Sequence, residues 1–200
     1  MVINPNNPTG TLHSRASLHS LLADIQILKG FLIVDEAFMD VIVPTQSLIN
    51  LTDNKHLFVL RSIGKFFGLA GIRLGFLSAN QYWLDKLAEL GNPWEVNGPA
   101  QFVAEKALLD QQWQQHQLTN LRHLTADLTL LLSQTFDQKP TGTLLFQTVS
   151  LVNAPLIFER LCKQGIYVRL CDEQNALRFG IPLSTELPRL RLALKEIISS

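Results

Sequence analysis

The segment Arg61–Phe76, RSIGKFFGLAGIRLGF, constrains the fold of this chain more than any other stretch. It follows Leu57–Leu60 (LFVL), a short apolar and partly β-branched run that predicts a buried strand. The glycines of the segment allow the backbone to turn tightly beside a bulky group. Because open α/β sheets bind ligands at the carboxyl ends of their strands, we expect Ser62 and Lys65 to lie in a ligand-binding loop.

The chemistry of this loop centres on Lys65. A Walker-type phosphate loop would need glycine in place of Val59 and serine or threonine in place of Phe66, and the glycines do not spell GxGxxG. A buried lysine loses its proton readily, and its amine can then form a Schiff base. The alternative is a lysine that extends to solvent from a glycine-rich turn, which would be the better interpretation if Lys65 stood alone.

Lys65 is accompanied by further motifs. SxxK followed by GLAGxRxG resembles the cofactor-lysine segment of the fold-type I pyridoxal-phosphate (PLP) enzymes, in the aminotransferase class I/II group. NPNNPTG at residues 4–10, VDEAF at 34–38 and LRFG at 177–180 resemble three more segments of this group, in the expected order. The resemblance covers nearly the whole chain. It implies an α/β fold, in which part of a large domain with a mainly parallel sheet is followed by a small α+β domain.

The same resemblance implies five cofactor-binding residues. Lys65 would hold PLP as a Schiff base, and Asp35 would be the buried anion that keeps the pyridine nitrogen protonated. Asn7 would bind the phenolic oxygen of the cofactor, while Ser62 and Arg73 would bind its phosphate. The alternatives are ordinary structural roles: a turn asparagine, a capping aspartate and serine, and a surface ion pair for the arginine.

Arg169 and Arg178 lie on two predicted neighbouring strands. Each alone would be interpreted as an exposed ion pair on a neutral protein. The resemblance implies instead an anion clamp, in which Arg178 binds the substrate carboxylate and Arg169 a second anionic group, a phosphate. Asn7 is expected to contact the substrate as well. Since the two arginines would bind a carboxylate and a phosphate, the predicted substrate is a small phosphorylated amino acid.

Phe38 departs from the usual aminotransferase pattern, which has tyrosine at this position. DEAF is typical of the threonine-phosphate decarboxylases of cobalamin biosynthesis, which the chain also resembles in PWEVNGPA, GTLLFQ and LRFGIP. This favours PLP-dependent decarboxylation of L-threonine O-3-phosphate to 1-amino-2-propanol phosphate. Two alternatives stay open: a histidinol-phosphate-type aminotransferase, in which the freed Lys65 removes the α-proton, and a non-catalytic PLP-fold fragment.

The order of the motifs predicts the domain organisation. In the resembled family NPNNPTG lies near the middle of the polypeptide, so we expect this chain to be the C-terminal part of a longer enzyme. Residues 1–98 would belong to the PLP-binding large domain, 99–136 would form a long interdomain helix, and 137–200 would form the small α+β domain. The resemblance also implies a homodimer, because homologous sites are built across a dimer.

Composition narrows the partners and the compartment. The 17 basic residues balance the 17 acidic ones, and no basic patch with interleaved aromatics appears, so we expect no nucleic-acid partner. No apolar run is long enough to span a bilayer and no leader pattern is present, which predicts a soluble, cytoplasmic protein with no membrane partner. No metal is expected, because Cys162 and Cys171 lack metal-ligand spacing, and no third ligand accompanies His116 and His123.

Periodicity and turn residues predict the individual elements. Gly30 and Gly91-Asn92-Pro93 are expected to end the first two helices. The predicted helices cover Ser14–Lys29, Gln81–Leu90, Pro99 to about Gln134, Ala154–Lys163 and Glu186–Ile198. The predicted strands cover Phe31–Val34, Leu57–Leu60, Leu74–Leu77, GTLLFQTV (142–149), Gly165–Leu170 and Ala176–Gly180.

Overall fold

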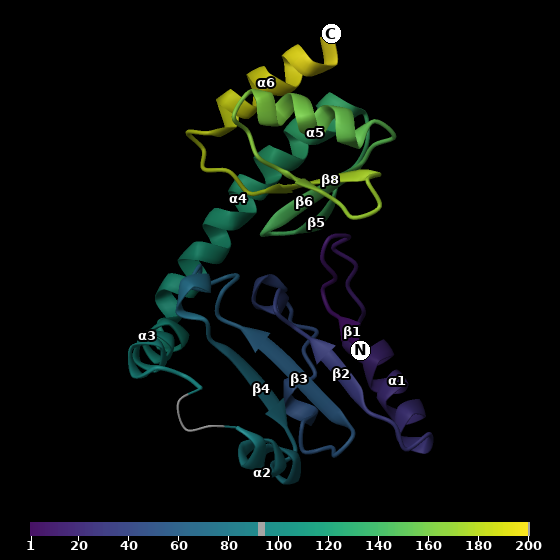
Figure 1. Cartoon of the computed structure of the whole chain (residues 1–200), viewed down its shortest axis with the longest axis vertical. Helices are drawn as coiled ribbons and strands as arrows, with labels where there is room; N and C mark the ends of the chain where they lie inside the picture. Colours follow the sequence, from purple (N-terminus) through teal and green to yellow (C-terminus); the bar gives the residue numbers. More distant parts are fainter. Residues whose placement is uncertain (92–94, 200) are drawn as a thin grey trace. The chain divides into compact units, whose positions relative to one another are not determined.

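A computed structural model describes residues 1–91 and 95–199 of the chain, which divide into two compact units (Figure 1). Unit 1 consists of Met1–Asn6 and Thr11–Gln111, and unit 2 consists of Asn7–Gly10 together with the chain from Gln112 onward. Asn92 and Pro93, expected to end a helix, lie outside the described residues, as does Trp94 of PWEVNGPA. Within the described ranges, no helix is both long and apolar enough to cross a membrane.

Unit 1 is built on a four-stranded sheet, sheet A, with the order β1-β2-β3-β4. Its strands are β1 (Val2–Ile3), β2 (Leu32–Asp35), β3 (Leu57–Ser62) and β4 (Gly75–Ala79). The first three run parallel and β4 is antiparallel to β3, which confirms the predicted mainly parallel sheet. Because Asp35 lies opposite Leu60 in the ladder, β2 and β3 leave the sheet at the same edge.

Helix α1 (Arg15–Ile27) covers one face of sheet A. Its Leu18 and Leu22 pack with Leu32 and Val34 of β2, which alternate inward along that strand as a half-buried strand requires. Ser14 caps the helix, since its side chain accepts a hydrogen bond from the backbone N–H of Ser17 at 3.1 Å. The start of this helix is therefore fixed by local sequence and its orientation by apolar packing.

Three further helices follow sheet A along the chain. Helix α2 (Gln81–Leu90) has the predicted bounds, and α3 (Gly98–Leu109) starts with Pro99 in its first turn. The prediction of one long helix over 99–136 is wrong, because Asp110 leaves the helical region at φ −80° and ψ 74° and α4 (Gln111–Phe136) begins after it. Aspartate is a poor residue for a helix interior, since its short side chain competes for nearby backbone groups.

Unit 2 contains a second sheet, sheet B, in which all neighbouring strands are antiparallel. The order is β5-β6-β8-β7, from β5 (Thr141–Thr143), β6 (Phe146–Ser150), β7 (Arg169–Leu170) and β8 (Ala176–Gly180). The single strand predicted for GTLLFQTV is wrong: it is a hairpin, whose turn is closed by a hydrogen bond from the Leu145 N–H to Thr143 Oγ1 at 3.1 Å.

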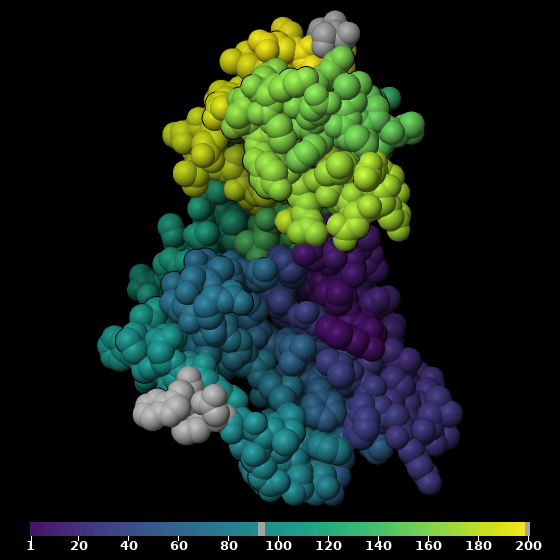
Figure 2. Space-filling view, viewed as in Figure 1, coloured from purple at the N-terminus to yellow at the C-terminus, as the bar shows by residue number. Residues whose placement is uncertain are grey.

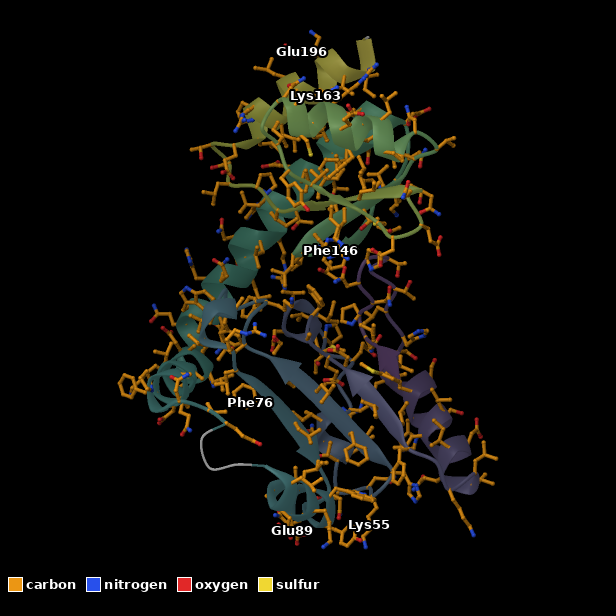
Figure 3. All side chains as sticks on the ribbon, viewed as in Figure 1. Lys55, Phe76, Glu89, Phe146, Lys163 and Glu196 are labelled. Atoms are coloured by element: carbon orange, nitrogen blue, oxygen red, sulfur yellow. The ribbon has the colours of Figure 1, made fainter. Side chains whose placement is uncertain are left out.

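The strand predicted over Gly165–Leu170 is shorter than expected. Only Arg169 and Leu170 pair with β8, and the N–H of Ile166 is bonded instead to the Leu161 carbonyl at the end of α5 (Ala154–Lys163). Helices α5 and α6 (Leu187–Ser199) form much of the visible surface of unit 2 (Figure 2), and Lys163 and Glu196 extend from them (Figure 3). Their apolar sides pack on the inner residues of sheet B, which include Val149, Leu177 and Phe179.

Helices α1 and α5 end in the same hydrogen-bond pattern. At α5 the N–H of Gly165 bonds to Cys162 and that of Ile166 to Leu161, with Gly165 in the left-handed region at φ +69°. At α1 the left-handed residue is Lys29, at φ +54°, and Gly30 is the next residue along. The prediction that Gly30 stops the helix was therefore one residue off, since the residue that reverses the chain is a lysine.

This difference predicts opposite effects of glycine at the two helix ends. Lys29→Gly should raise the free energy of unfolding of unit 1 by about 0.5–1 kcal/mol, because glycine avoids the left-handed penalty of a side-chain-bearing residue. Gly165→Ala should lower that of unit 2 by about 1 kcal/mol. Urea unfolding followed by circular dichroism measures both. Lys29→Ala is the matched control and should change little; an equal gain in Lys29→Ala would contradict the explanation.

Candidate functional site

Four of the predicted site residues line one pocket of unit 1. Asp35 at the end of β2, Ser62 at the end of β3, and Lys65 and Arg73 in the loop after β3 surround a cavity of about 370 Å³. Ligand sites of small molecules typically have volumes of about 300–1,000 Å³. The sheet register therefore brings together side chains that are up to 38 positions apart in the sequence, from 35 to 73.

Asp35 is held by its own chain and keeps one oxygen available. Its Oδ1 accepts a hydrogen bond from the N–H of Ala37 at 2.9 Å. Within the part of the chain that the structure describes, Oδ2 has no hydrogen-bond partner. The carboxylate is half-buried at the pocket wall, so Oδ2 can accept a proton-bearing group of a ligand.

The loop that carries Lys65 is fixed by the side chains around it. Ile63 and Phe66 are buried on either side of the lysine, and the N–H of Gly64 donates to Ser62 Oγ at 3.2 Å. Lys65 itself is exposed, which corrects the expectation of a buried lysine. Because the two apolar neighbours of Lys65 occupy the interior, the tight turn points Lys65 outward at the pocket rim.

Phe38 lies beside the lysine. The Lys65 Nζ is 5.4 Å from the centre of the Phe38 ring, a cation–π distance. Where a tyrosine would present a hydroxyl, this chain presents only an aromatic face. The residue that departs from the aminotransferase pattern is thus a direct neighbour of the predicted Schiff-base lysine.

Arg73 has an unusual backbone. It adopts the left-handed conformation at φ 56° and ψ 47°, directly after the 3₁₀ turn Ala70–Ile72, and its Nη1 donates to the Ala70 carbonyl at 3.2 Å. Residues with a Cβ persist in this region mainly where the surrounding structure requires it, and functional sites are a common place. From this position Arg73 lines the pocket.

A buried charge network next to the pocket was missed by the sequence analysis. Glu36 is fully buried, and its carboxylate accepts hydrogen bonds from Ser47 Oγ at 2.5 Å and from the Leu48 N–H at 2.8 Å. Arg61 pairs with Glu36 at 3.5 Å and also with Asp40. Burial raises the pKa of the Asp40 carboxyl, and the neighbouring Arg61 opposes this. No spacing rule joins position 36 to position 61, so only the fold reveals the network.

The predicted substrate-binding residues lie in unit 2. Arg178 on β8 donates from Nη1 to Asn7 Oδ1 at 2.5 Å, and its guanidinium carbon is 5.6 Å from the ring centre of Phe146, labelled in Figure 3. Arg169 on β7 is the direct cross-strand neighbour of Arg178. Burial lowers the pKa of the Arg178 guanidinium, and the charge of Arg169 lowers it further. Asn7, Arg169 and Arg178 therefore form one cluster.

Arg169 is exposed and forms an ion pair with Asp172 at 3.4 Å. Cys171, which lies between these two residues in the sequence, is a buried free cysteine. Burial raises the pKa of its thiol, and the charges of Arg178 and Arg169 oppose this. His116 and His123 are exposed on α4. Within residues 1–91 and 95–199, no group of three or more potential ligands could hold a metal ion.

The segment Asn7–Gly10 is tied closely to sheet B. Thr148, which lies opposite Arg178 in the ladder, donates from Oγ1 to the Pro8 carbonyl at 2.6 Å. Gly10 adopts φ +74°, and a Cβ added there would lie 2.4 Å from the Gly142 Cα. Thr148 was missed because a threonine in a strand carries no signal of this contact. The cross-strand pair of Thr148 and Arg178 thus holds Pro8 and Asn7.

The unit 1 pocket has the chemistry that PLP requires. A carboxylate with a free oxygen suits a protonated pyridine nitrogen, a lysine amine suits the aldehyde, and a hydroxyl with a guanidinium suits the phosphate. Asp35, Lys65, Ser62 and Arg73 supply these four groups around one cavity. The residues present therefore fit the cofactor.

The sequence profile described as "Aminotransferase class I and II" matches residues 1–192. The chain belongs to this family. It is 41% identical to the threonine-phosphate decarboxylase of Pseudomonas aeruginosa over 182 residues, which are 91% of this chain and 55% of that protein. It is 31% identical to a histidinol-phosphate aminotransferase of Haemophilus influenzae, covering 98% of this chain and 58% of that protein.

The structure agrees with this family membership. A histidinol-phosphate aminotransferase from Sinorhizobium meliloti, solved in complex with pyridoxal-5'-phosphate, superposes with a TM-score of 0.86 at 20% identity, covering 98% of this chain and 56% of that one. At this identity the likeness shows the fold. The chain spans about half the length of the curated relatives that it matches.

The close approach of Gly10 to Gly142 predicts a strong position dependence of alanine substitution. Gly10→Ala should lower the free energy of unfolding of unit 2 by about 2–4 kcal/mol, because it adds both a left-handed penalty and a backbone clash. Gly71→Ala is the matched control: its Cβ would meet nothing within 4 Å, and its effect should stay within about 0.5 kcal/mol. Urea titration of both variants checks this, and equal effects would refute it.

Proposed function

We propose that this chain supplies the cofactor lysine and the substrate arginines of a PLP-dependent enzyme that decarboxylates L-threonine O-3-phosphate to 1-amino-2-propanol phosphate in cobalamin biosynthesis. The observation that carries the proposal is the gathering of Asp35, Ser62, Lys65 and Arg73 around one pocket of unit 1. The choice of reaction is supported by Phe38 and by the 41% identity to a threonine-phosphate decarboxylase.

Each pocket residue has one task toward the cofactor. Lys65 anchors PLP through its amine, Ser62 and Arg73 bind the phosphate, and Asp35 Oδ2 accepts the proton-bearing ring nitrogen. The resemblance assigns the phenolic oxygen of the cofactor to Asn7, whose amide nitrogen can donate because its Oδ1 already accepts from Arg178. When bound, PLP supplies an electron sink for the pair of electrons that a departing group leaves on the substrate α-carbon.

The remaining chemistry is proton transfer and orientation. The resemblance assigns the substrate carboxylate to Arg178 and the phosphate to Arg169, and two anchored groups would fix the orientation of the bonds at the α-carbon. When CO2 leaves, its bonding electrons stay with the substrate, and the α-carbon must gain one proton. We assign the donation of this proton to Lys65 Nζ, because that nitrogen lies at the pocket rim beside Phe38.

A second candidate function is that of a histidinol-phosphate-type aminotransferase. It is favoured by the 31% identity over 98% of the chain to an enzyme of that name. The same residues would serve, but Lys65 Nζ would remove the α-proton instead of donating one. The decarboxylase would break the bond from the α-carbon to the carboxylate, and the aminotransferase the bond from the α-carbon to its proton. The products of the two reactions therefore distinguish them.

Assembly follows from the resemblance, and compartment from the composition. We expect a homodimer, since homologous sites are built across a dimer, and a cytoplasmic location. The proposed partner is a small phosphorylated amino acid, with no nucleic-acid or membrane partner.

The first test is the visible absorbance spectrum of the purified chain with added PLP. Wild type should show the band of lysine-bound PLP, and Lys65→Ala should lose it, because no other amine takes its place. Lys55→Ala, at an exposed lysine labelled in Figure 3, is the control and should keep the band. CO2 release from threonine phosphate selects the decarboxylase, and amino transfer to a keto acid selects the aminotransferase. Without a band in wild type, this chain has no working cofactor site by itself.

The two arginines should differ in which part of the substrate they recognise. Arg169→Gln should weaken binding of threonine phosphate about 10- to 100-fold, as expected for a lost charge-assisted contact, and leave threonine nearly unchanged. Arg178→Gln should weaken both ligands, because both carry the carboxylate. Isothermal titration calorimetry with the two ligands measures this. A loss of threonine binding in Arg169→Gln would disprove the assigned roles.

A further inference from the structure

We propose that Arg61 and Glu36 are positioning residues of the cofactor site, which hold Asp35 in the orientation that receives the ring nitrogen. The inference rests on the proposed function in that it takes the pocket of Asp35 and Lys65 as a PLP site. The pair itself has no task in the chemistry described above. Arg61 nevertheless lines that pocket, and Glu36 lies in sequence between two of its lining residues, Asp35 and Ala37.

Glu36 is a fully buried carboxylate with every oxygen engaged. Its Oε1 accepts from the Leu48 N–H at 2.8 Å, and its Oε2 accepts from Ser47 Oγ at 2.5 Å and from Arg61 Nη1 at 3.5 Å. The side chain therefore connects the residue after Asp35 to a point 12 positions later. A buried charge is tolerated only when it is paired and hydrogen-bonded, so this connection is rigid.

Arg61 completes the connection from the neighbouring strand. Its Nη1 reaches Glu36 and its Nη2 reaches Asp40, so one guanidinium joins β3 to both ends of the turn after β2. Arg61 also lines the pocket, which raises the question of whether it binds the phosphate. With two carboxylates on one guanidinium its charge is already compensated, and this favours positioning over phosphate binding.

The pair acts on Asp35 through the backbone. The N–H of Glu36 donates to the Leu60 carbonyl at 2.9 Å, and the next N–H, that of Ala37, donates to Asp35 Oδ1 at 2.9 Å. Holding the Glu36 side chain therefore holds the amide that orients the Asp35 carboxylate. The following residue is Phe38, whose ring lies beside Lys65. Leaving the buried Glu36 carboxylate without its cation should release both contacts together.

The test compares Arg61→Met, Glu36→Gln and the double variant in their binding of PLP and of pyridoxal, which lacks the phosphate. Arg61→Met leaves the buried Glu36 carboxylate without its cation, and should weaken both ligands on the order of tenfold. Glutamine at position 36 can still accept from Leu48 and donate to Ser47, so the double variant should regain most of the affinity for both. If Arg61 instead binds the phosphate, only PLP binding falls and the double variant does not recover, which overturns the proposal.

Amide hydrogen exchange of the chain without PLP gives an independent readout. In Arg61→Met the amides of Ala37 and Leu48 should exchange on the order of tenfold faster, and the double variant should restore them. Unchanged exchange at Ala37 would overturn the proposal. If wild type binds no PLP, the proposed function fails for this chain, and the exchange result alone decides the role of the pair.

Two exposed residues of unit 2 provide matched controls. Arg122→Met on α4 and Glu196→Gln on α6 make the same chemical changes away from the network, and Glu196 is labelled in Figure 3. Both should leave cofactor affinity and the exchange of Ala37 unchanged. Equal effects in these controls would attribute the losses to a general change of charge, and the proposal would fall.

Discussion

The parallel pairing of β2 with β3 is the constraint on which the candidate site depends. The ladder sets Val34 opposite Val59 and Asp35 opposite Leu60, so both strands leave sheet A at the same edge. Apolar packing of α1 fixes that register, because a shift by one residue would turn Leu32 and Val34 away from the core. The position of the Asp35 carboxylate relative to Lys65 thus follows from the burial of Leu32 and Val34 on the other face of β2.

Two adjacent carboxylates at this edge have separate tasks. Asp35 lines the pocket with one oxygen free, while Glu36 is buried and engaged with Ser47, Leu48 and Arg61. Successive side chains of an extended segment point to opposite sides, so one turn supplies both a ligand-facing and an interior acid. The interior acid is paired with Arg61, since a buried carboxylate needs a partner in place of water. The ligand-facing acid leaves an oxygen open to a proton-bearing group.

Local sequence predicts the elements whose ends are set by local chemistry. The bounds of α2, α5 and β8 agree with the predictions, because caps and apolar periodicity determine them. The errors arise where a single side chain redirects the backbone: Asp110 divides a helix, Thr143 closes a hairpin, and Lys29 takes the left-handed position expected of glycine. Such events depend on one hydrogen bond or one dihedral angle, which periodicity does not report.

The site shows the same division. Asp35, Ser62, Lys65 and Arg73 could be named from motifs, and the fold places them around one pocket. The contacts of Arg61 with Glu36 and of Thr148 with Pro8 could not be predicted from motifs. They join residues 25 and 140 positions apart, respectively, through side chains that have many ordinary roles. Exposure of Lys65 was predicted only as the alternative interpretation, since it depends on which neighbours fill the interior.

The electrostatics of Arg178 bear on the class of ligand. Its only described polar partner is the neutral oxygen of Asn7, and its cross-strand neighbour is another arginine; among the described residues it pairs with no carboxylate. A partly buried cation beside a second cation is destabilised, as the lowered pKa of Arg178 reflects. An anion bound between the two would relieve both the desolvation and the repulsion. Binding free energy would therefore favour a ligand that brings an anionic group to Arg178 over a neutral one.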